Sequence, residues 1–118
     1  MINYHEIITH IYTEFNNRNI LEVLSAMKPD VHWPNGWEGG YVIGHADVEA
    51  YWLRQWKEID SKVYALSVSE RSDGRIEVDV RQTGADLTGK LLFDQQVKHI
   101  YEFKDGLIAS MEIESPGH

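Results

Sequence analysis

One histidine of this sequence stands in a row of apolar residues. Residues 97–103 alternate in polarity, which places Val97, His99, Tyr101 and Phe103 on one face of an expected strand. An imidazole, with a reference pKa of about 6.5, can act there as a general acid or base, or donate a hydrogen bond to a carbonyl or enolate oxygen. The alternative is a half-buried histidine that bonds a neighbouring strand group or a water molecule.

Two glutamines are candidates to share a cavity with His99. Gln82 alternates with Val78 and Val80, so it faces the cavity if these valines point inward. Gln55 is the only polar residue on the apolar face of the third expected helix. Buried amides need hydrogen-bond partners, so the two glutamines can instead bond each other or free backbone groups. Convergence of all three side chains would favour a ligand site.

Large aromatic side chains are abundant for so short a chain, with 4 Trp and 6 Tyr. Trp52 and Trp56 lie at helical spacing and are expected in the core. Trp37 lies in a glycine-rich loop, where it is expected to cover a pocket or contact another subunit. These rings favour an apolar, planar ligand that a few polar groups orient. The candidate ligand-binding residues are Trp33, Trp37, Gln55, Trp56, Gln82, Asp86, Tyr101 and Met111.

The sequence gives weaker support for a catalytic carboxylate or a metal site than for a site at His99. Asp86 and Glu38 are the acids nearest to the expected pocket mouth, and an inward Asp86 would form an acid–base pair with His99. A solvated aspartate in a turn is the more ordinary interpretation of Asp86. His5 and His10 do not have the four-residue helical spacing of paired metal ligands, and the other histidines form no ligand cluster, so no metal site is predicted.

The composition of the 118 residues is that of a globular domain, and one domain over residues 1–118 is expected. A formal net charge of −8 with scattered Lys and Arg argues against a nucleic-acid surface. The absence of cysteine excludes disulfides, thiolate nucleophiles and cysteine metal sites. The sequence shows no basic N-terminal region and no apolar run of about 20 residues. Neither a signal peptide nor a membrane span is therefore predicted, and a cytoplasmic location is expected.

Three helices are expected in the N-terminal half. Asn3 and Glu6 form a capping box ahead of a first helix, whose apolar residues recur up to Phe15. A second, shorter helix covers residues 20–27 and ends at Lys28-Pro29. Residues 31–33 form a brief strand, residues 35–44 form a glycine-rich loop, and a third helix runs from about Ala46 to Ile59.

The C-terminal half switches to a period of two. Strands are expected over residues 63–70, 76–83, 91–103 and 107–113, and an Asp105-Gly106 turn joins the last two. Helices followed by a meander of antiparallel strands define an α+β fold. Because each helix has one apolar stripe, the helices must cover one face of the sheet.

This order of elements resembles the nuclear transport factor 2 superfamily, which includes ketosteroid isomerases and SnoaL-like polyketide cyclases. The sharpest local matches are Trp33-Pro34, Gly44-His45-Ala46-Asp47-Val48 and residues 101–108. The combination of Trp37-Glu38-Gly39-Gly40, Tyr51-Trp52, Gln55-Trp56 and Gln82 is similar to a bacterial SnoaL-like subgroup. The resemblance implies a cone-shaped, cystatin-like α+β barrel, in which a curved, mostly antiparallel sheet wraps three helices and leaves an apolar pocket at its open end.

The resemblance also shows where this chain departs from the isomerases. Isomerases place a general-base carboxylate just before the proline of the first strand, where this chain has Trp33. Their oxyanion-binding tyrosine on the first helix falls at or beside Ile11, and His99 replaces their protonated carboxylic acid on the late strand. Steroid isomerisation by the familiar mechanism is therefore not expected.

The sequence thus predicts a SnoaL-like protein that binds a hydrophobic small molecule in an apolar pocket and uses no cofactor. If it is catalytic, the expected reaction is proton transfer next to a carbonyl, as in an isomerase, cyclase, dehydratase or hydrolase. His99 would move the proton, and Gln82 or Gln55 would orient the substrate. The alternatives are a non-catalytic ligand carrier and an interaction domain. A homodimer is expected, because members of the superfamily commonly pair through the convex face of the sheet.

Overall fold

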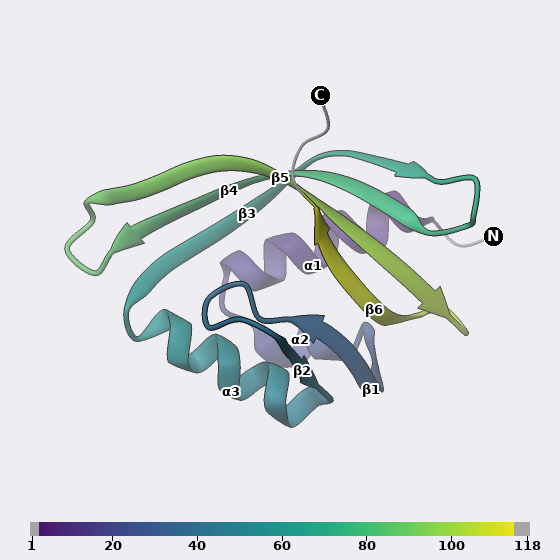
Figure 1. The fold of residues 1–118 in the computed structure, drawn as a ribbon, viewed down its shortest axis with the longest axis horizontal. Helices are drawn as coiled ribbons and strands as arrows, with labels where there is room; N and C mark the ends of the chain where they lie inside the picture. Colours follow the sequence, from purple (N-terminus) through teal and green to yellow (C-terminus); the bar gives the residue numbers. More distant parts are fainter. Residues whose placement is uncertain (1–2, 115–118) are drawn as a thin grey trace.

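A six-stranded sheet curves around the helices in the computed structural model, which describes residues 3–114 (Figure 1). The helices are α1 (Tyr4–Asn16), α2 (Ile20–Leu24) and α3 (His45–Trp56). The strands are β1 (Met27–Pro34), β2 (Tyr41–Ile43), β3 (Ile59–Glu70), β4 (Ile76–Asp86), β5 (Leu91–Lys104) and β6 (Leu107–Glu114). Within the described residues, no helix combines the length and the apolar character that a membrane crossing requires.

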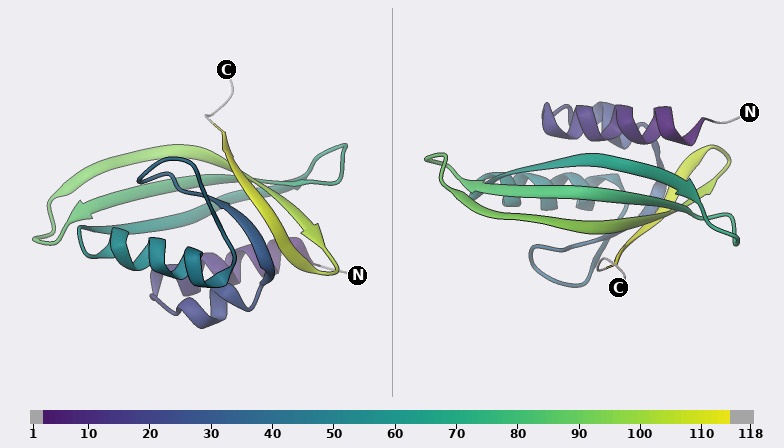
Figure 2. Two further views of the ribbon diagram at one scale, coloured as in Figure 1. Left: turned by 60° about the horizontal axis from the view of Figure 1, so that its bottom comes forward. Right: turned by 90° about the horizontal axis from the view of Figure 1, so that it is seen from above.

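The strands of the sheet follow the order β2-β1-β6-β5-β4-β3. β1 and β6 run parallel, and the other neighbouring pairs are antiparallel. β2 and β3 form the two edges, so the sheet bends into an open cone and does not close into a complete barrel (Figure 2). This arrangement confirms the predicted α+β fold, in which helices pack in a curved, mostly antiparallel sheet.

Local sequence signals explain where α1 begins and where β5 turns into β6. The side chain of Asn3 accepts a hydrogen bond from the backbone N–H of Glu6 at 3.1 Å and so caps α1. At the β5–β6 turn, Asp105 and Gly106 have φ angles of 53° and 79°, the left-handed values that a tight hairpin turn requires. The hairpin brings the start of β6 back along β5, whose inner face carries the candidate histidine.

The core lies between the helices and the inner face of the sheet. From α1, Ile8, Ile11 and Tyr12 point into it and are at most 5% exposed. From β4, Val78 is fully buried, and it pairs with His99 of β5. Burial of apolar surface, worth about 25 cal/mol per Å², holds α1 against the sheet. The predicted alternation of β5 therefore places the imidazole on the core side.

The second helix is shorter than predicted, because its expected end belongs to a strand. The apolar residues at helical spacing predict a second helix that extends to Met27. In the structure α2 ends at Leu24 and Met27 is the first residue of β1. Pro29, which has no N–H to donate, lies where the β1–β6 register shifts between Met27 and His32. The interrupted ladder accommodates a proline inside the strand, so Lys28-Pro29 does not mark a helix end.

Other predicted boundaries are wrong because strand pairing overrides the local pattern. The expected loop over residues 35–44 contains β2, in which Val42 pairs with Trp33 of β1. The third helix ends at Trp56, and Ile59 begins β3, where it pairs with Asp86 at the end of β4. β3 and β4 are therefore both longer than their own sequence patterns predict.

Candidate functional site

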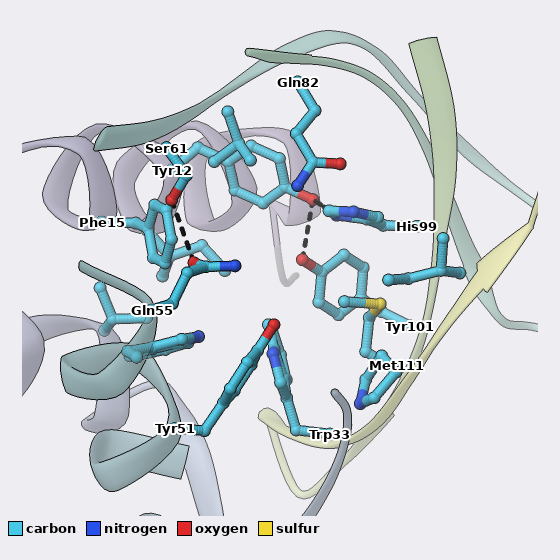
Figure 3. Close-up of a pocket in the computed structure, with 16 residues that line it drawn as sticks. Tyr12, Phe15, Trp33, Tyr51, Gln55, Ser61, Gln82, His99, Tyr101 and Met111 are labelled. Carbon is cyan, nitrogen blue, oxygen red and sulfur yellow. Dashed lines mark hydrogen bonds between the residues drawn. The ribbon is translucent and has the colours of Figure 1, made fainter. Parts of the chain in front are cut away.

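A cavity opens between α1, α3 and the inner face of the sheet (Figure 3). The empty space of this cavity, including the part open to solvent, is about 580 Å³. Its apolar lining consists of Ile11, Phe15, Val23, Trp33, Pro34, Trp52, Val63, Met111 and Ile113. Its polar lining consists of Tyr12, Tyr51, Gln55, Ser61, Gln82, His99 and Tyr101. Among the residues that the structure describes, no Asp, Glu, Lys or Arg lines this cavity.

Three of the polar side chains, Tyr12, His99 and Tyr101, form a hydrogen-bonded group that we call the Tyr–His–Tyr cluster. The Tyr12 hydroxyl lies 2.6 Å from His99 Nδ1 and 2.8 Å from the Tyr101 hydroxyl (Figure 3). All three side chains are buried. Tyr12 comes from α1, whereas His99 and Tyr101 follow each other on the inner face of β5. The packing of α1 on the sheet therefore assembles the cluster.

Burial determines the protonation of the cluster. It lowers the pKa of His99 to about 4, so the imidazole is neutral near pH 7. Burial also raises the pKa of Tyr12 well above its ordinary value, and the neighbouring Tyr101 adds to this effect. Burial raises the pKa of Tyr101 as well, against a smaller opposite effect of its hydrogen bond with Tyr12. All three groups are therefore neutral, and both phenols keep their hydrogens.

The hydrogens of the cluster decide what it offers to a ligand. A neutral imidazole carries one N–H and each phenol one O–H, and the two internal bonds use two of these three hydrogens. If His99 donates from Nδ1 to Tyr12 and Tyr12 donates to Tyr101, the Tyr101 hydroxyl keeps its hydrogen for a ligand. If Tyr101 donates to Tyr12 and Tyr12 donates to His99, the free hydrogen lies on His99 Nε2.

A second hydrogen-bonded group, the Trp56–Ser61–Gln55 chain, links α3 to β3. Trp56 Nε1 donates to Ser61 Oγ at 3.2 Å, and Ser61 Oγ donates to Gln55 Oε1 at 3.1 Å. Both Ser61 and Gln55 are buried. The amide nitrogen of Gln55 points away from Ser61 and into the cavity (Figure 3).

Gln82 and Tyr51 complete the polar lining. Gln82 reaches the cavity from β4 and lies near Tyr12 (Figure 3). Gln95 Nε2 donates to the side-chain oxygen of Gln82 at 3.5 Å, which is a weak bond at this length. Burial raises the pKa of the Tyr51 phenol, and polar groups of the Trp37 and Gly36 backbone and of Gln55 partly offset this effect.

The structure brings most of the candidate residues to the cavity, namely Trp33, Gln55, Gln82, His99, Tyr101 and Met111. Trp37 lies outside it, 39% exposed in the β1–β2 loop. Trp56 does not line the cavity; its ring stacks on Trp52, and the Arg18 guanidinium lies 4.4 Å from the ring centroid. Trp56 thus reaches the site through its N–H bond to Ser61.

The two carboxylates expected near the pocket mouth are engaged elsewhere. Asp86 is the last residue of β4, and its side chain accepts hydrogen bonds from Thr88 and from the backbone N–H of Lys90 in the β4–β5 turn. These bonds, from Thr88 first, lower its pKa, so Asp86 is a turn carboxylate and forms no pair with a cavity residue. Glu38 accepts hydrogen bonds from Arg54 and Asn35, which lower its pKa to about 2.

Tyr12 and Ser61 are site residues that sequence reasoning missed. The helical pattern counts Tyr12 among the apolar residues of the first helix, and the resemblance places the isomerase tyrosine at or beside Ile11. Successive helical residues are about 100° apart, so both side chains can reach the cavity, and Tyr12 is the one that bonds His99. Ser61 precedes the predicted strand, and its alternation with Val63 is the signal that a longer strand would have supplied.

Helices enclosed by an open, curved sheet, with a mostly apolar cavity between them, define the nuclear transport factor 2-like α+β cone. Residues 8–111 match the model of the SnoaL-like domain, and the chain therefore belongs to this family. Among proteins of curated function, none matches the sequence.

Solved structures share the fold over nearly the whole chain. A nuclear transport factor 2-like protein of unknown function from Burkholderia pseudomallei is 23% identical, with a TM-score of 0.82, and the match covers 98% of this chain and 92% of that one. TerC, co-crystallized with polyporic acid, is 25% identical, with a TM-score of 0.80 and coverage of 96% and 90%. A putative polyketide cyclase from Pseudomonas putida is 17% identical, with a TM-score of 0.81 and coverage of 98% and 93%.

Proposed function

We propose that this protein binds a hydrophobic carbonyl compound in the cavity and promotes proton transfer next to the carbonyl without a cofactor. Isomerisation, cyclisation, dehydration and hydrolysis are the reactions of this type. The observation that carries the proposal is the Tyr–His–Tyr cluster, a set of neutral hydrogen-bonding groups buried at the cavity wall. The small molecule bound by TerC and the putative cyclase activity of the P. putida neighbour support it.

The cluster offers a donor to a carbonyl oxygen. In the arrangement that leaves the Tyr101 hydrogen free, the ligand oxygen accepts from Tyr101, Tyr101 from Tyr12, and Tyr12 from His99. Each donor polarises the next, and burial strengthens every bond of the chain. An enolate oxygen, which forms when an α-proton leaves, is therefore stabilised more than the neutral carbonyl.

In the same arrangement His99 is the proton acceptor. Its Nδ1 carries the hydrogen, so Nε2 carries the lone pair. His99 and Tyr101 are two residues apart on one face of β5, which brings the α-carbon of a ligand bound to Tyr101 near the imidazole. Proton uptake at Nε2 yields an imidazolium, whose Nδ1–H donates more strongly to Tyr12 and stabilises the enolate through the chain. Return of the proton to another carbon completes an isomerisation.

A ligand carrier is the second candidate function. Two observations favour it: no carboxylate of the described chain lines the cavity, and burial makes His99 a weak base with a pKa of about 4. A carrier would use the same donors to bind a carbonyl and would not convert it. An interaction domain that binds no ligand is disfavoured, because side chains would fill the interior of its cone, whereas this cone contains a cavity.

Hydrogen–deuterium exchange distinguishes an enzyme from a carrier without a known substrate. β-Tetralone, a bicyclic ketone, is incubated with the protein in D₂O, and the loss of its α-proton NMR signal is followed. An enzyme accelerates this loss, and Tyr101→Phe should reduce the acceleration about 100-fold, as the removal of an oxyanion donor does. Tyr41→Phe, which alters an exposed tyrosine of β2, should leave it unchanged.

Two results would decide against catalysis. Binding of β-tetralone, measured by quenching of tryptophan fluorescence, with exchange at the background rate would identify a carrier. Absence of both binding and exchange across a set of apolar ketones would contradict the proposed function altogether.

A further inference from the structure

We infer that the Trp56–Ser61–Gln55 chain makes the cavity selective for ligands with a second oxygen acceptor, so that the ligand is a hydrophobic diketone, enedione or quinone-like compound. The inference rests on the proposed function, because it assigns the first ligand oxygen to the Tyr–His–Tyr cluster. The second oxygen would meet the Gln55 amide nitrogen, which enters the cavity from α3, across from the side chains of β5 (Figure 3).

Hydrogen-bond chemistry decides which end of the Gln55 amide faces the cavity. The Trp56 indole nitrogen can only donate, so Ser61 Oγ accepts from it. The hydroxyl hydrogen of Ser61 then needs an acceptor, and Gln55 Oε1 at 3.1 Å provides it. If the amide turned over, its N–H would face Ser61 Oγ, and the hydroxyl hydrogen of a side chain that is 1% exposed would lose this acceptor. The amide therefore presents its N–H groups to the cavity.

Packing holds the Trp56 end of the chain in place. The Trp56 ring stacks on Trp52 with centroids 6.0 Å apart, and it meets the Phe15 ring edge-on at 5.1 Å. The Arg18 guanidinium covers it, and Arg18 is itself paired with Asp60. The indole cannot turn its N–H away from Ser61 without losing these contacts, so the orientation of Gln55 is set before a ligand arrives.

The cavity thus presents donors from two separate walls. A ligand with oxygen atoms at both positions satisfies Tyr101 and Gln55 together. A ligand that places only hydrocarbon near Gln55 leaves a desolvated N–H without an acceptor, which weakens binding.

The test compares two ketones that differ in one carbonyl. β-Decalone has a single carbonyl, and the matched decalin diketone carries a second one on the opposite ring. Their affinities are measured by calorimetry with the full chain and its variants. The wild type should bind the diketone about tenfold more tightly, the effect of one additional hydrogen bond. Gln55→Leu should bring the ratio of affinities close to one.

Further variants separate the hydrogen-bonded chain from general packing. Ser61→Ala and Trp56→Phe should each reduce the ratio, because the amide is then free to turn over. Gln96→Leu, which changes an exposed side chain on the outer face of β5, is the control and should keep the wild-type ratio. If Gln55→Leu fails to fold, Gln55→Met, which is similar in length and has no N–H, takes its place. A merely structural role would lower both affinities and leave their ratio unchanged.

The outcomes distinguish this inference from the proposed function. Binding of both ketones with a wild-type ratio near one, or with a ratio that Ser61→Ala leaves unchanged, would overturn the inference while ketone binding stands. Failure of both ketones to bind would overturn the proposed function and the inference with it. A ratio that falls in Gln55→Leu and in Ser61→Ala, and persists in Gln96→Leu, would support the inference.

Discussion

Replacement of His99 by glutamine should flatten the dependence of stability on pH in the acid range. Burial lowers the pKa of this imidazole from 6.5 to about 4 in the folded chain. Above pH 6.5 neither state binds the proton, and the stability associated with the neutral imidazole is fully present. Between pH 6.5 and pH 4 the unfolded chain binds a proton that the folded chain does not, so the free energy of unfolding falls as the pH falls. Below pH 4 both states are protonated, and this contribution stays constant.

The size of the effect follows from the gap between the two pKa values. One pKa unit corresponds to about 1.4 kcal/mol, so the gap between 6.5 and about 4 corresponds to about 3 kcal/mol over the whole range. Between pH 7 and pH 5 the linkage relation gives about 2 kcal/mol. His99→Gln also removes a hydrogen bond to Tyr12 and therefore lowers stability at every pH. The test thus uses the slope of the free energy of unfolding against pH and not its absolute values.

Urea unfolding followed by tryptophan fluorescence at pH 7, 6 and 5 measures this slope. The carboxylates are common to both proteins, so their titration cancels when the variant curve is subtracted from the wild-type curve. His10→Gln is the control, because its side chain is 58% exposed and solvent reaches the imidazole. Equal slopes in the wild type and His99→Gln would refute the reasoning that a buried neutral imidazole lies at the cavity wall.

Three other predictions concern the frame around the site. Gly84→Ala should destabilise the chain by about 1–3 kcal/mol in thermal melts, because a Cβ there would lie 2.3 Å from the Phe93 ring. Phe93→Ala should then restore part of the loss, and an unchanged melting temperature in Gly84→Ala would contradict this packing. Glu38→Gln should speed hydrogen exchange in the β1–β2 loop, since it weakens the pair with Arg54 of α3; an unchanged exchange rate would show that the pair does not hold the loop. A sizing column should show a homodimer, favoured by Tyr64 and Leu66 exposed on edge strand β3, and elution as a monomer would argue against it.

The parts of the fold that local chemistry decides were predictable from the sequence. The Asn3 cap and the Asp105-Gly106 turn are short-range signals, and both occur where the pattern places them. The parts that depend on distant partners were not. Pro29 lies within β1 because the ladder to β6 shifts beside it, and Ile59 extends β3 because it pairs with Asp86. A local pattern carries no information about such partners.

The candidate site was predictable to the same extent. Strand alternation places His99 and Gln82 at the cavity, because period two alone decides which face a side chain takes. Tyr12 was not predicted as a site residue, because an aromatic residue on the apolar face of a helix has the pattern of a core residue. Its hydroxyl group becomes part of the site only through a partner 87 residues away in the sequence. Ser61 was not predicted as a site residue, because β3 begins at Ile59, before the first residue of the predicted strand.

The ¹³C chemical shift of the carbonyl carbon in a bound ketone is the most direct test of the claim that the Tyr–His–Tyr cluster binds the carbonyl oxygen. β-Tetralone labelled with ¹³C at its carbonyl is bound to the wild type and to Tyr101→Phe, and the carbonyl chemical shift is measured at saturation. A hydrogen bond from the Tyr–His–Tyr cluster should move the wild-type signal downfield, and Tyr101→Phe should remove most of this displacement while the ligand remains bound. A wild-type signal at the position of the free ketone, or the same displacement in both proteins, would contradict the claim that this cluster holds the carbonyl oxygen.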